Sequence, residues 1–244
     1  MKQQTMTIAS TRKLNQGIYQ TVLRGDTSPI TAPGQFINLK IPDHYLRRPI
    51  SIADWDECSM TIIYKVVGSG TSALSRLSVG TSLDVLTGLG NGFDVDKACA
   101  AGTPTLLGGG IGTPPIYGLA KTLVRQGVTP TVITGFATAE DVILQEEFRA
   151  LGIDPVLMTD DGSAGEKGFV TDALARTEAG YVCACGPEPM LRAVWNACSH
   201  GQFSFEARMA CGFGACMGCS CRTKYGNKRI CKDGPVLEGG EILW

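Results

Sequence analysis

Five cysteines lie close together near the C-terminal end of the sequence, four of them in CGFGACMGCSC at positions 211–221 and the fifth at Cys231. Cys211, Cys216 and Cys219 have the spacing C-x4-C-x2-C, which together with a distal cysteine is the plant-type ferredoxin arrangement for a [2Fe–2S] cluster. The glycines between them allow a loop to curl around a small inorganic core and leave backbone N–H groups free to point at sulfur. The pattern therefore predicts an iron–sulfur site.

Two alternatives for these cysteines stay open at this point. A zinc site usually has two C-x2-C pairs, and only one clear pair occurs here. Inert, packed thiols are disfavoured because five cysteines among glycines would make a poor core. We assign the fourth iron ligand to Cys231 because the usual fourth cysteine is distal, although Cys221 could take its place. The predicted metal ligands are Cys211, Cys216, Cys219 and Cys231.

A glycine-rich turn has the chemistry of a phosphate site. In PTLLGGGIGTPPIYGLAK, residues 104–121, a buried strand runs through glycines into a helix whose N-terminus offers free N–H groups and a partial positive charge. The two prolines fit the first helical turn. Pro115 stands where the motif G-x-G-x-x-G would have its last glycine, so a tight turn that binds no ligand is the alternative.

A second motif, CACGPEPM at positions 183–190, joins the end of another buried strand to a helix. Ligands of open α/β sheets bind at the carboxyl ends of the strands, so the two motifs together predict a dinucleotide site. Its predicted residues are Gly108, Gly109, Gly110, Ile111, Gly112, Thr113, Cys185, Gly186 and Pro187.

The elements that must position these residues change in type along the chain. Short β-branched strands separated by turn formers predict a small antiparallel barrel over residues 1–98. Buried strands then alternate with helices over residues 99–202, which predicts a parallel sheet. Residues 203–244 are too few for a core of their own and need a metal or another staple. The helices are expected at Pro115–Gln126, Ala139–Leu151, Val170–Arg176 and Pro187–His200. The fold class is therefore a multidomain β plus α/β protein with a small C-terminal cluster domain.

Composition limits the class of protein further. The chain has 244 residues, 43% of them hydrophobic, and a formal net charge of −1. No overall charge draws it to nucleic acid or to a membrane, and it has no apolar run long enough for a signal peptide or a span. We therefore expect a cytoplasmic protein whose ten cysteines are reduced.

The barrel region contains RRPISI, in which Arg48 could clamp a phosphate and Ser51 could hydrogen-bond a ring nitrogen. An ordinary edge strand is the alternative. The order RPIS, GSGT, GGGIGTPP and CGPEPML, followed by EARMACGFGACMGCSC and CKDGPV, resembles the electron-transfer subunits of the B-type, NAD-dependent dihydroorotate dehydrogenases, in the ferredoxin–NADP reductase superfamily. The resemblance covers nearly the whole chain.

The resemblance implies FAD in the barrel, NAD(H) in the α/β domain and a [2Fe–2S] cluster at the C-terminal end. Ser51 would lie near the reactive flavin nitrogen. The loop between Cys219 and Cys231 is shorter than in comparable family members, so the sequence departs from the family pattern next to the fourth ligand. The FAD contacts that it implies are Arg48, Pro49, Ile50, Ser51, Ile63, Tyr64, Lys65, Gly70 and Thr71.

NADH gives a hydride and an iron–sulfur cluster accepts one electron, so a flavin belongs between them. The resemblance implies a separate FMN-containing dihydroorotate dehydrogenase catalytic subunit in pyrimidine (UMP) biosynthesis, in a heterotetramer with two copies of each subunit. We expect no catalytic acid or base in this chain. The alternative is a small subunit of a related flavin/iron–sulfur oxidoreductase, of the sulfide dehydrogenase or NADPH–ferredoxin oxidoreductase type.

Two charge patterns lead to further hypotheses. No arginine or lysine occurs between Thr134 and Gln145, whereas Glu140 and Asp141 do, which favours NADH over NADPH. The cluster segment is basic and forms either a docking rim or an ordinary solvated face. Its cations are Arg222, Lys224, Lys228, Arg229 and Lys232.

Overall fold

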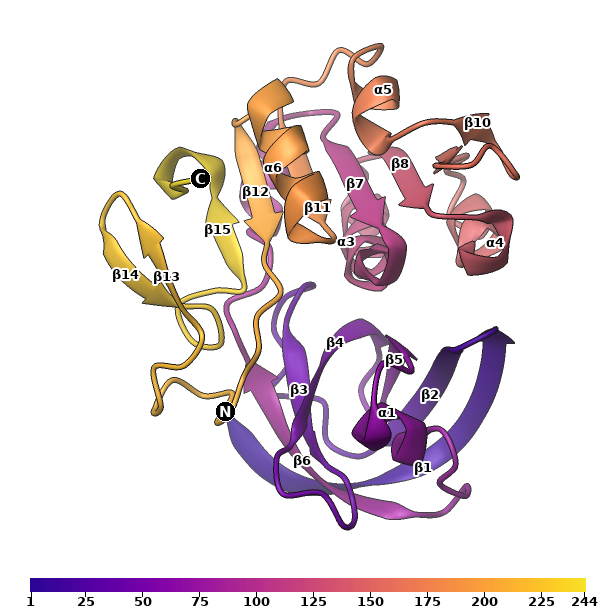
Figure 1. The fold of residues 1–244 in the computed structure, drawn as a ribbon, viewed down its shortest axis with the longest axis vertical. Helices are drawn as coiled ribbons and strands as arrows, with labels where there is room; N and C mark the ends of the chain where they lie inside the picture. Colours follow the sequence, from indigo (N-terminus) through magenta and orange to yellow (C-terminus); the bar gives the residue numbers. More distant parts are fainter.

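A computed structural model of the protein describes residues 1–244 as a β-barrel joined to an α/β layer, with a cysteine-bearing segment beside both (Figure 1). Six antiparallel strands close the barrel in the order β1-β2-β5-β4-β3-β6. Alternate residues of each strand point inward, and buried Ile37, Leu39 and Ile62 belong to the resulting core. The strands are β1 (Lys2–Asn15), β2 (Ile18–Arg24), β3 (Phe36–Lys40), β4 (Arg48–Trp55), β5 (Ser59–Lys65) and β6 (Ser82–Leu89).

The α/β layer is a seven-stranded sheet in the order β10-β9-β8-β7-β11-β12-β15, parallel except for β15. Strands covered on both faces are apolar throughout, which explains the continuous hydrophobic runs. The strands are β7 (Thr105–Gly109), β8 (Thr131–Phe136), β9 (Val156–Thr159), β10 (Glu166–Lys167), β11 (Val182–Cys185), β12 (Gly201–Ser204) and β15 (Val236–Glu238). The helices are α2 (Val95–Ala100), η1 (Gly110–Gly112), α3 (Thr113–Arg125), η2 (Ala139–Asp141), α4 (Gln145–Ala150), α5 (Val170–Leu174), α6 (Glu188–Ala197) and η3 (Gly239–Glu241).

The predicted fold class is confirmed, but some helical segments, α2 among them, differ from expectation. The helix expected over Ala139–Leu151 is interrupted, because Leu144 has a left-handed backbone with φ of +66°. Its side chain is buried in the core, and Gln145 donates a hydrogen bond to the Thr134 hydroxyl at 3.0 Å. Tertiary packing therefore overrides the helical pattern. A short helix, α1 (Ser69–Leu74), also forms where only a turn was expected.

The C-terminal segment leaves the sheet of the α/β layer and returns to it. Strands β12 and β15 both belong to the seven-stranded sheet, and they pair with each other antiparallel. The hairpin of β13 (Ser220–Thr223) and β14 (Gly226–Arg229) and the cysteine loop before it are inserted between them. The cysteines are therefore carried on an insertion that is anchored in the sheet at both ends.

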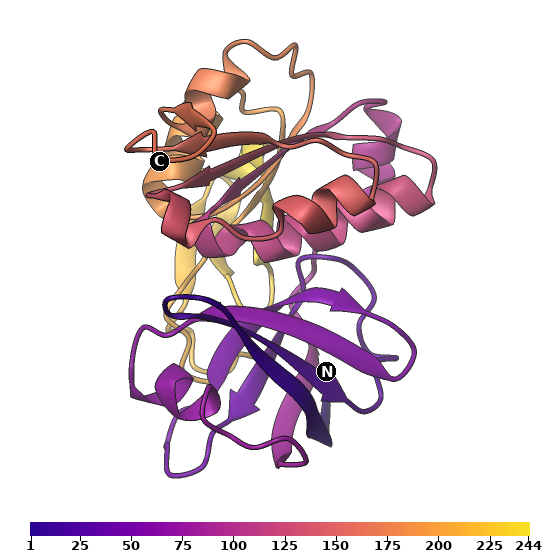
Figure 2. The same cartoon turned by 90° about the vertical axis from the view of Figure 1, so that its right-hand side faces the viewer.

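The barrel faces the carboxyl ends of the parallel strands, as the arrowheads of β7 and β8 in Figure 1 show. Helix α3 packs closely against barrel strand β4: a Cβ added at Gly118 would lie only 2.8 Å from the carbonyl oxygen of Ala53. Figure 2 shows the barrel and the α/β layer stacked one above the other. None of the helices is long and apolar enough to cross a membrane.

Candidate cofactor sites

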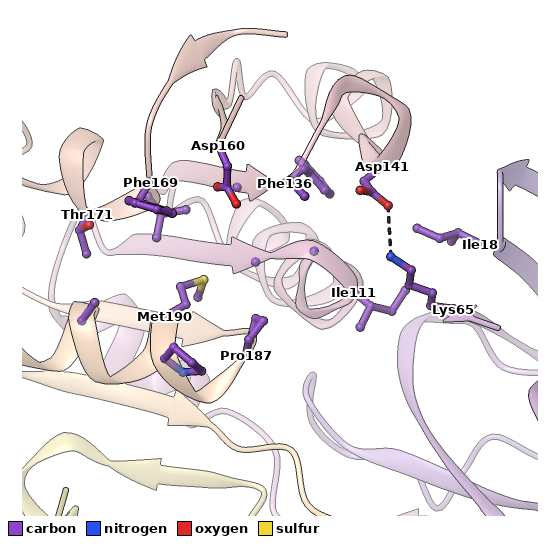
Figure 3. Close-up of a pocket in the computed structure, with 17 residues that line it drawn as sticks. Ile18, Lys65, Ile111, Phe136, Asp141, Asp160, Phe169, Thr171, Pro187 and Met190 are labelled. Atoms are coloured by element: carbon purple, nitrogen blue, oxygen red, sulfur yellow. Dashed lines mark hydrogen bonds and ion pairs between the residues drawn. The ribbon is translucent and has the colours of Figure 1, made fainter. Parts of the chain in front are cut away.

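A cleft of about 540 Å³ lies at the carboxyl ends of the parallel strands, where the sheet faces the barrel. Figure 3 shows its lining, which we call the nucleotide cleft. Ile18 and Lys65 come from the barrel, whereas all other lining residues come from the α/β layer. The lining residues are Ile18, Lys65, Gly109, Gly110, Ile111, Gly135, Phe136, Ala137, Asp141, Asp160, Phe169, Val170, Thr171, Pro187, Pro189, Met190 and Ala193.

The two motifs predicted to bind a dinucleotide meet at this cleft. A Cβ at Gly112 would overlap the Cys185 carbonyl, and one at Gly109 would overlap the sulfur of Met190. Only glycine therefore lets the turn after β7 approach the end of β11 so closely. Gly109, Gly110, Ile111 and Pro187 line the cleft, whereas Gly108, Gly112, Thr113, Cys185 and Gly186 lie buried behind it.

The acidic residues of the nucleotide cleft differ from those that the sequence indicated. Asp141 is not free, because it forms an ion pair with Lys65 at 3.2 Å across the cleft (Figure 3). Glu140 is exposed and does not line the cleft. Asp160, at the end of β9, points into the cleft and has no hydrogen bond or ion pair to its carboxylate. The sequence analysis missed Asp160, although its place after a buried strand could have indicated it.

Strand β4 begins with one open edge beside helix α1. Residues 48–51 pair with β3, whereas pairing with β5 starts only at Ile52. The Arg48 side chain lies directly over Gly70, where a Cβ would overlap the guanidinium, and it donates a hydrogen bond to the Leu46 carbonyl. No carboxylate pairs with Arg48. A cation beside an open strand edge and a glycine is a suitable place for a phosphate group, so the site fits a flavin dinucleotide.

The three residues of β5 in the predicted FAD site are placed differently from one another. The side chains of Ile63 and Tyr64 are buried in hydrophobic cores. Tyr64 stacks on Tyr19 with ring centroids 6.2 Å apart, and burial raises the pKa of its hydroxyl. Lys65 lies in the nucleotide cleft. Pro49, Ile50, Ser51 and Thr71 are partly or fully buried around the start of β4 and α1.

The four predicted iron ligands fall into two pairs. The backbone N–H of Cys216 donates to the sulfur of Cys211 at 3.4 Å, and that of Cys231 donates to the sulfur of Cys219 at 3.4 Å. The Gly218 N–H points at the sulfur of Cys216 at 3.5 Å. No three His, Cys, Asp or Glu side chains are arranged around a single metal position. Two pairs with amides directed at sulfur fit a two-iron cluster.

The thiol pKa is lowered at Cys211 and raised at Cys231. Burial opposes ionisation of Cys211, but the backbone N–H groups of Phe213, Cys216 and Ala215 outweigh it and lower the pKa to about 6. Burial first, and then the neighbouring thiols of Cys219 and Cys211, raise the pKa of Cys231 to about 12. Because a thiolate is the metal ligand, a loop that already favours one thiolate is suited to bind a cation that would ionise the rest.

Three cysteines outside the set of four, Cys183, Cys185 and Cys221, pack in hydrophobic cores. Cys221 lies in β13 and burial raises its pKa, as it does for Cys183 in β11. Burial raises the pKa of Cys185 to about 12. These three thiols are therefore suited to packing.

The predicted basic rim is mostly engaged in internal pairs. Lys228 pairs with Glu241, Arg229 pairs with Asp233 at 2.9 Å, and Lys224 donates to the Gly240 carbonyl at 2.8 Å. Of the five cations, Arg222 and Lys232 have no such partner. The surface next to exposed Cys216 is instead apolar, since Phe213 and Met217 are 43% and 53% exposed.

Comparisons with known proteins agree with this geometry. Residues 206–243 match the family model described as the iron–sulfur cluster binding domain of dihydroorotate dehydrogenase B, and residues 106–196 match the oxidoreductase NAD-binding domain. The chain is 29% identical, with a TM-score of 0.88, to a solved structure described as an NADH-dependent reduced ferredoxin-NADP oxidoreductase; the match covers 98% of this chain and 90% of that one. Phthalate dioxygenase reductase shares the fold at a TM-score of 0.66 and 18% identity. The fold and the sites thus define an NAD-dependent flavin and iron–sulfur oxidoreductase.

Full-length relatives narrow this class. The chain is 42% identical to the electron transfer subunit of dihydroorotate dehydrogenase B (NAD(+)) from Geobacillus sp. (strain WCH70), over 100% of this chain and 99% of that one. It is 39% identical to the same subunit from Fusobacterium nucleatum, over 99% of both chains. The chain belongs to this family of electron transfer subunits. It is an oxidoreductase subunit with FAD, [2Fe–2S] and NAD(H) as cofactors, and its family implies a separate catalytic subunit.

Proposed function

We propose that the nucleotide cleft binds NADH, that Arg48 to Ser51 with Gly70 and Thr71 hold FAD, and that Cys211, Cys216, Cys219 and Cys231 hold the cluster. FAD would then lie in residues 1–98, the nucleotide in residues 99–202 and the cluster in residues 203–244, with β15 of the last segment completing the sheet of the α/β layer. The meeting of the two glycine motifs at one cleft facing the barrel is the observation that carries this proposal.

The cofactors, the glycine turn and the apolar residues of the cleft would have different roles in electron transfer. When bound, the flavin would accept the two electrons of one hydride, and the cluster would pass them on one at a time. Gly109 and Gly110 let the nucleotide backbone approach the N-terminus of helix α3, whose N–H groups suit a pyrophosphate. Apolar Ile111 and Met190 exclude water from the reacting rings. We expect no side chain to act as a general acid or base, because hydride transfer requires none.

Asp160 would accept hydrogen bonds from the adenosine ribose and repel a 2′-phosphate. It lies at the end of β9, on the same sheet edge as the glycine turn after β7. The one cation of the cleft, Lys65, is held by Asp141, so it does not neutralise a phosphate. This supports a preference for NADH over NADPH.

The partner would be an FMN-containing dihydroorotate dehydrogenase catalytic subunit, in a cytoplasmic heterotetramer with two copies of each chain that serves pyrimidine (UMP) biosynthesis. Its docking surface would include Phe213 and Met217, because they are exposed, apolar and next to exposed Cys216. Electrons would leave across this surface.

The test is anaerobic addition of NADH to the purified chain, followed by visible and EPR spectroscopy, and native mass spectrometry after co-expression with a catalytic subunit. We expect bleaching of the flavin, the signal of a reduced [2Fe–2S] cluster, and a complex with two copies of each subunit. A colourless chain would refute the cofactor assignment. A complex of another composition, with normal spectra, would refute only the stoichiometry.

A further inference from the structure

Strand β3 separates the proposed flavin-binding strand from the cysteine loop. In the β3–β4 register Asn38 lies opposite Pro49, and Phe36 lies opposite Ser51. Ile37, which lies between them, and Leu39, which follows Asn38, fill the barrel core, so Phe36 and Asn38 face outward together with their partners on β4. One outer face of the barrel thus carries residues of both strands.

The cysteine segment packs on this same face. Phe36, Leu86 and Leu89 belong to one hydrophobic cluster with Cys219 and Cys231. Leu86 and Leu89 are on β6, the other neighbour of β3. The segment therefore shares a hydrophobic core with residues of β3 and β6, and the proposed flavin-binding strand β4 is the neighbour of β3 on the side away from β6.

Asn38 makes the polar contact between these parts. Asn38 belongs to barrel strand β3, and its Nδ2 donates a hydrogen bond to the backbone carbonyl of Cys211 at 3.1 Å. Asn38 is only 1% exposed, and its Oδ1 is buried without a hydrogen-bond partner. The unpaired Oδ1 costs free energy, so any stabilisation by the Asn38 side-chain amide comes from the hydrogen bond that its Nδ2 donates to Cys211.

The loop approaches Asn38 as closely as a backbone can. Gly212 has a φ of +77°, and a Cβ there would overlap the Nδ2 of Asn38. Any other residue at this position would both strain the backbone and push the loop off the barrel. The bond to the Cys211 carbonyl also fixes the start of the turn whose N–H groups at Phe213 and Cys216 point at the Cys211 sulfur.

We propose that Asn38 is a positioning residue that holds the cysteine loop against β3 and so sets the separation and the electrostatic environment of the cluster relative to the flavin. Neighbouring strands lie about 4.8 Å apart, so a single strand between the two sites gives a short path. This inference rests on the flavin and cluster residues proposed above. Asn38 itself need not touch either cofactor.

The experiment compares the wild-type complex with Asn38→Leu, Gly212→Ala and the double variant. Asn91→Leu is the matched control, because Asn91 also joins the barrel side to the C-terminal segment, through two bonds to Val236, away from the cysteines. The readouts are FAD content, the rate of flavin reduction by NADH, the lifetime of the cluster under a chelator and its midpoint potential from EPR-monitored titration.

We expect Asn38→Leu to keep its FAD and its rate of flavin reduction. Loss of one hydrogen bond should shorten the chelator lifetime of the cluster by about tenfold. The midpoint potential should fall, since the N–H groups that stabilise the reduced cluster lose their orientation. Gly212→Ala should shorten the cluster lifetime and lower the midpoint potential in the same way without altering the barrel. The double variant should show no larger change than the more affected single variant, because both substitutions act at one contact.

Unchanged lifetime and potential in Asn38→Leu would overturn the inference and leave the cluster assignment intact. Loss of FAD in that variant would make Asn38 a flavin-binding residue, which also overturns it. An equal effect of Asn91→Leu would show only a loosened domain junction and would count against it too. A wild-type chain without a cluster would refute the proposed function itself.

Discussion

The cysteine loop and the nucleotide cleft are built in opposite ways. Three of the four proposed iron ligands lie within nine residues, and amides of the same loop point at the sulfurs of Cys211 and Cys216. The cleft collects residues from Ile18 to Ala193 and is shaped by glycines and apolar side chains. A site made from one loop should fail completely when a single ligand is lost, whereas a site spread over many segments should weaken by degrees.

The cysteines make the contrast chemical. Backbone amides lower the pKa of Cys211 to about 6, whereas burial raises that of Cys185, behind the cleft, to about 12. The same side chain is therefore a prepared metal ligand in an amide-rich loop and an inert filler in a buried strand.

The largest effect is expected from the ligands. Cys211→Ser, Cys216→Ser, Cys219→Ser and Cys231→Ser should each abolish the cluster, because a [2Fe–2S] centre needs four ligands. Iron and sulfide analysis is the measurement. Cys221→Ser is the control that should retain the cluster; loss there together with a normal cluster in Cys231→Ser would reverse the assignment of the fourth ligand.

The second-largest effect is expected in the rates at which Cys211 and Cys185 are alkylated in protein stripped of iron. A thiol reacts as its thiolate, so alkylation of Cys211 should rise with pH, with a midpoint at the pKa of about 6, and level off above it. Cys185, with a pKa of about 12, should react at least ~100-fold more slowly at pH 7. Mass mapping of a time course measures both, and equal rates would remove the chemical basis of the comparison.

Loss of one residue from the flavin site should weaken FAD binding without abolishing it. Arg48→Ala would remove a charge-assisted hydrogen bond to the pyrophosphate, worth roughly 1.5 to 3 kcal/mol, and should weaken FAD binding by about ten- to a hundredfold. The flavin-to-protein ratio after dialysis measures it. Arg47→Ala is the neighbouring control, since Arg47 is already paired with Asp84 at 2.6 Å. Full flavin retention in Arg48→Ala would make Arg48 a surface residue only.

The smallest effect is expected at the nucleotide. NADH should be preferred over NADPH by at least ~10-fold in kcat/KM, since no free cation of the cleft is available for a 2′-phosphate. Asp160→Ala should narrow this ratio. Asp161→Ala should not, because that carboxylate accepts hydrogen bonds from Ser163 and does not line the cleft. Steady-state dye reduction with each nucleotide tests this, and a wild-type preference for NADPH would contradict it.

Much of the fold could be predicted from the sequence. Alternating strands, then βα alternation, then a cysteine loop predicted the barrel and the parallel sheet correctly, because hydrophobic periodicity is a local signal. The interruption at Leu144 could not be predicted, because it arises from burial of that side chain among residues distant in the sequence. The return of the chain into the sheet as β15 was missed for the same reason.

The sequence by itself determined which cysteines could share a cluster and which turns could face a phosphate, since both depend on spacing and on glycine within a few residues. Only the tertiary structure decided that Asp141 is paired and Asp160 is free, that Lys228 and Arg229 turn to internal partners, and that Asn38 of the barrel bonds to Cys211. The Lys65–Asp141 ion pair and the Asn38–Cys211 hydrogen bond join segments far apart in the chain. They depend on which surfaces the folded domains press together, and no local pattern records that.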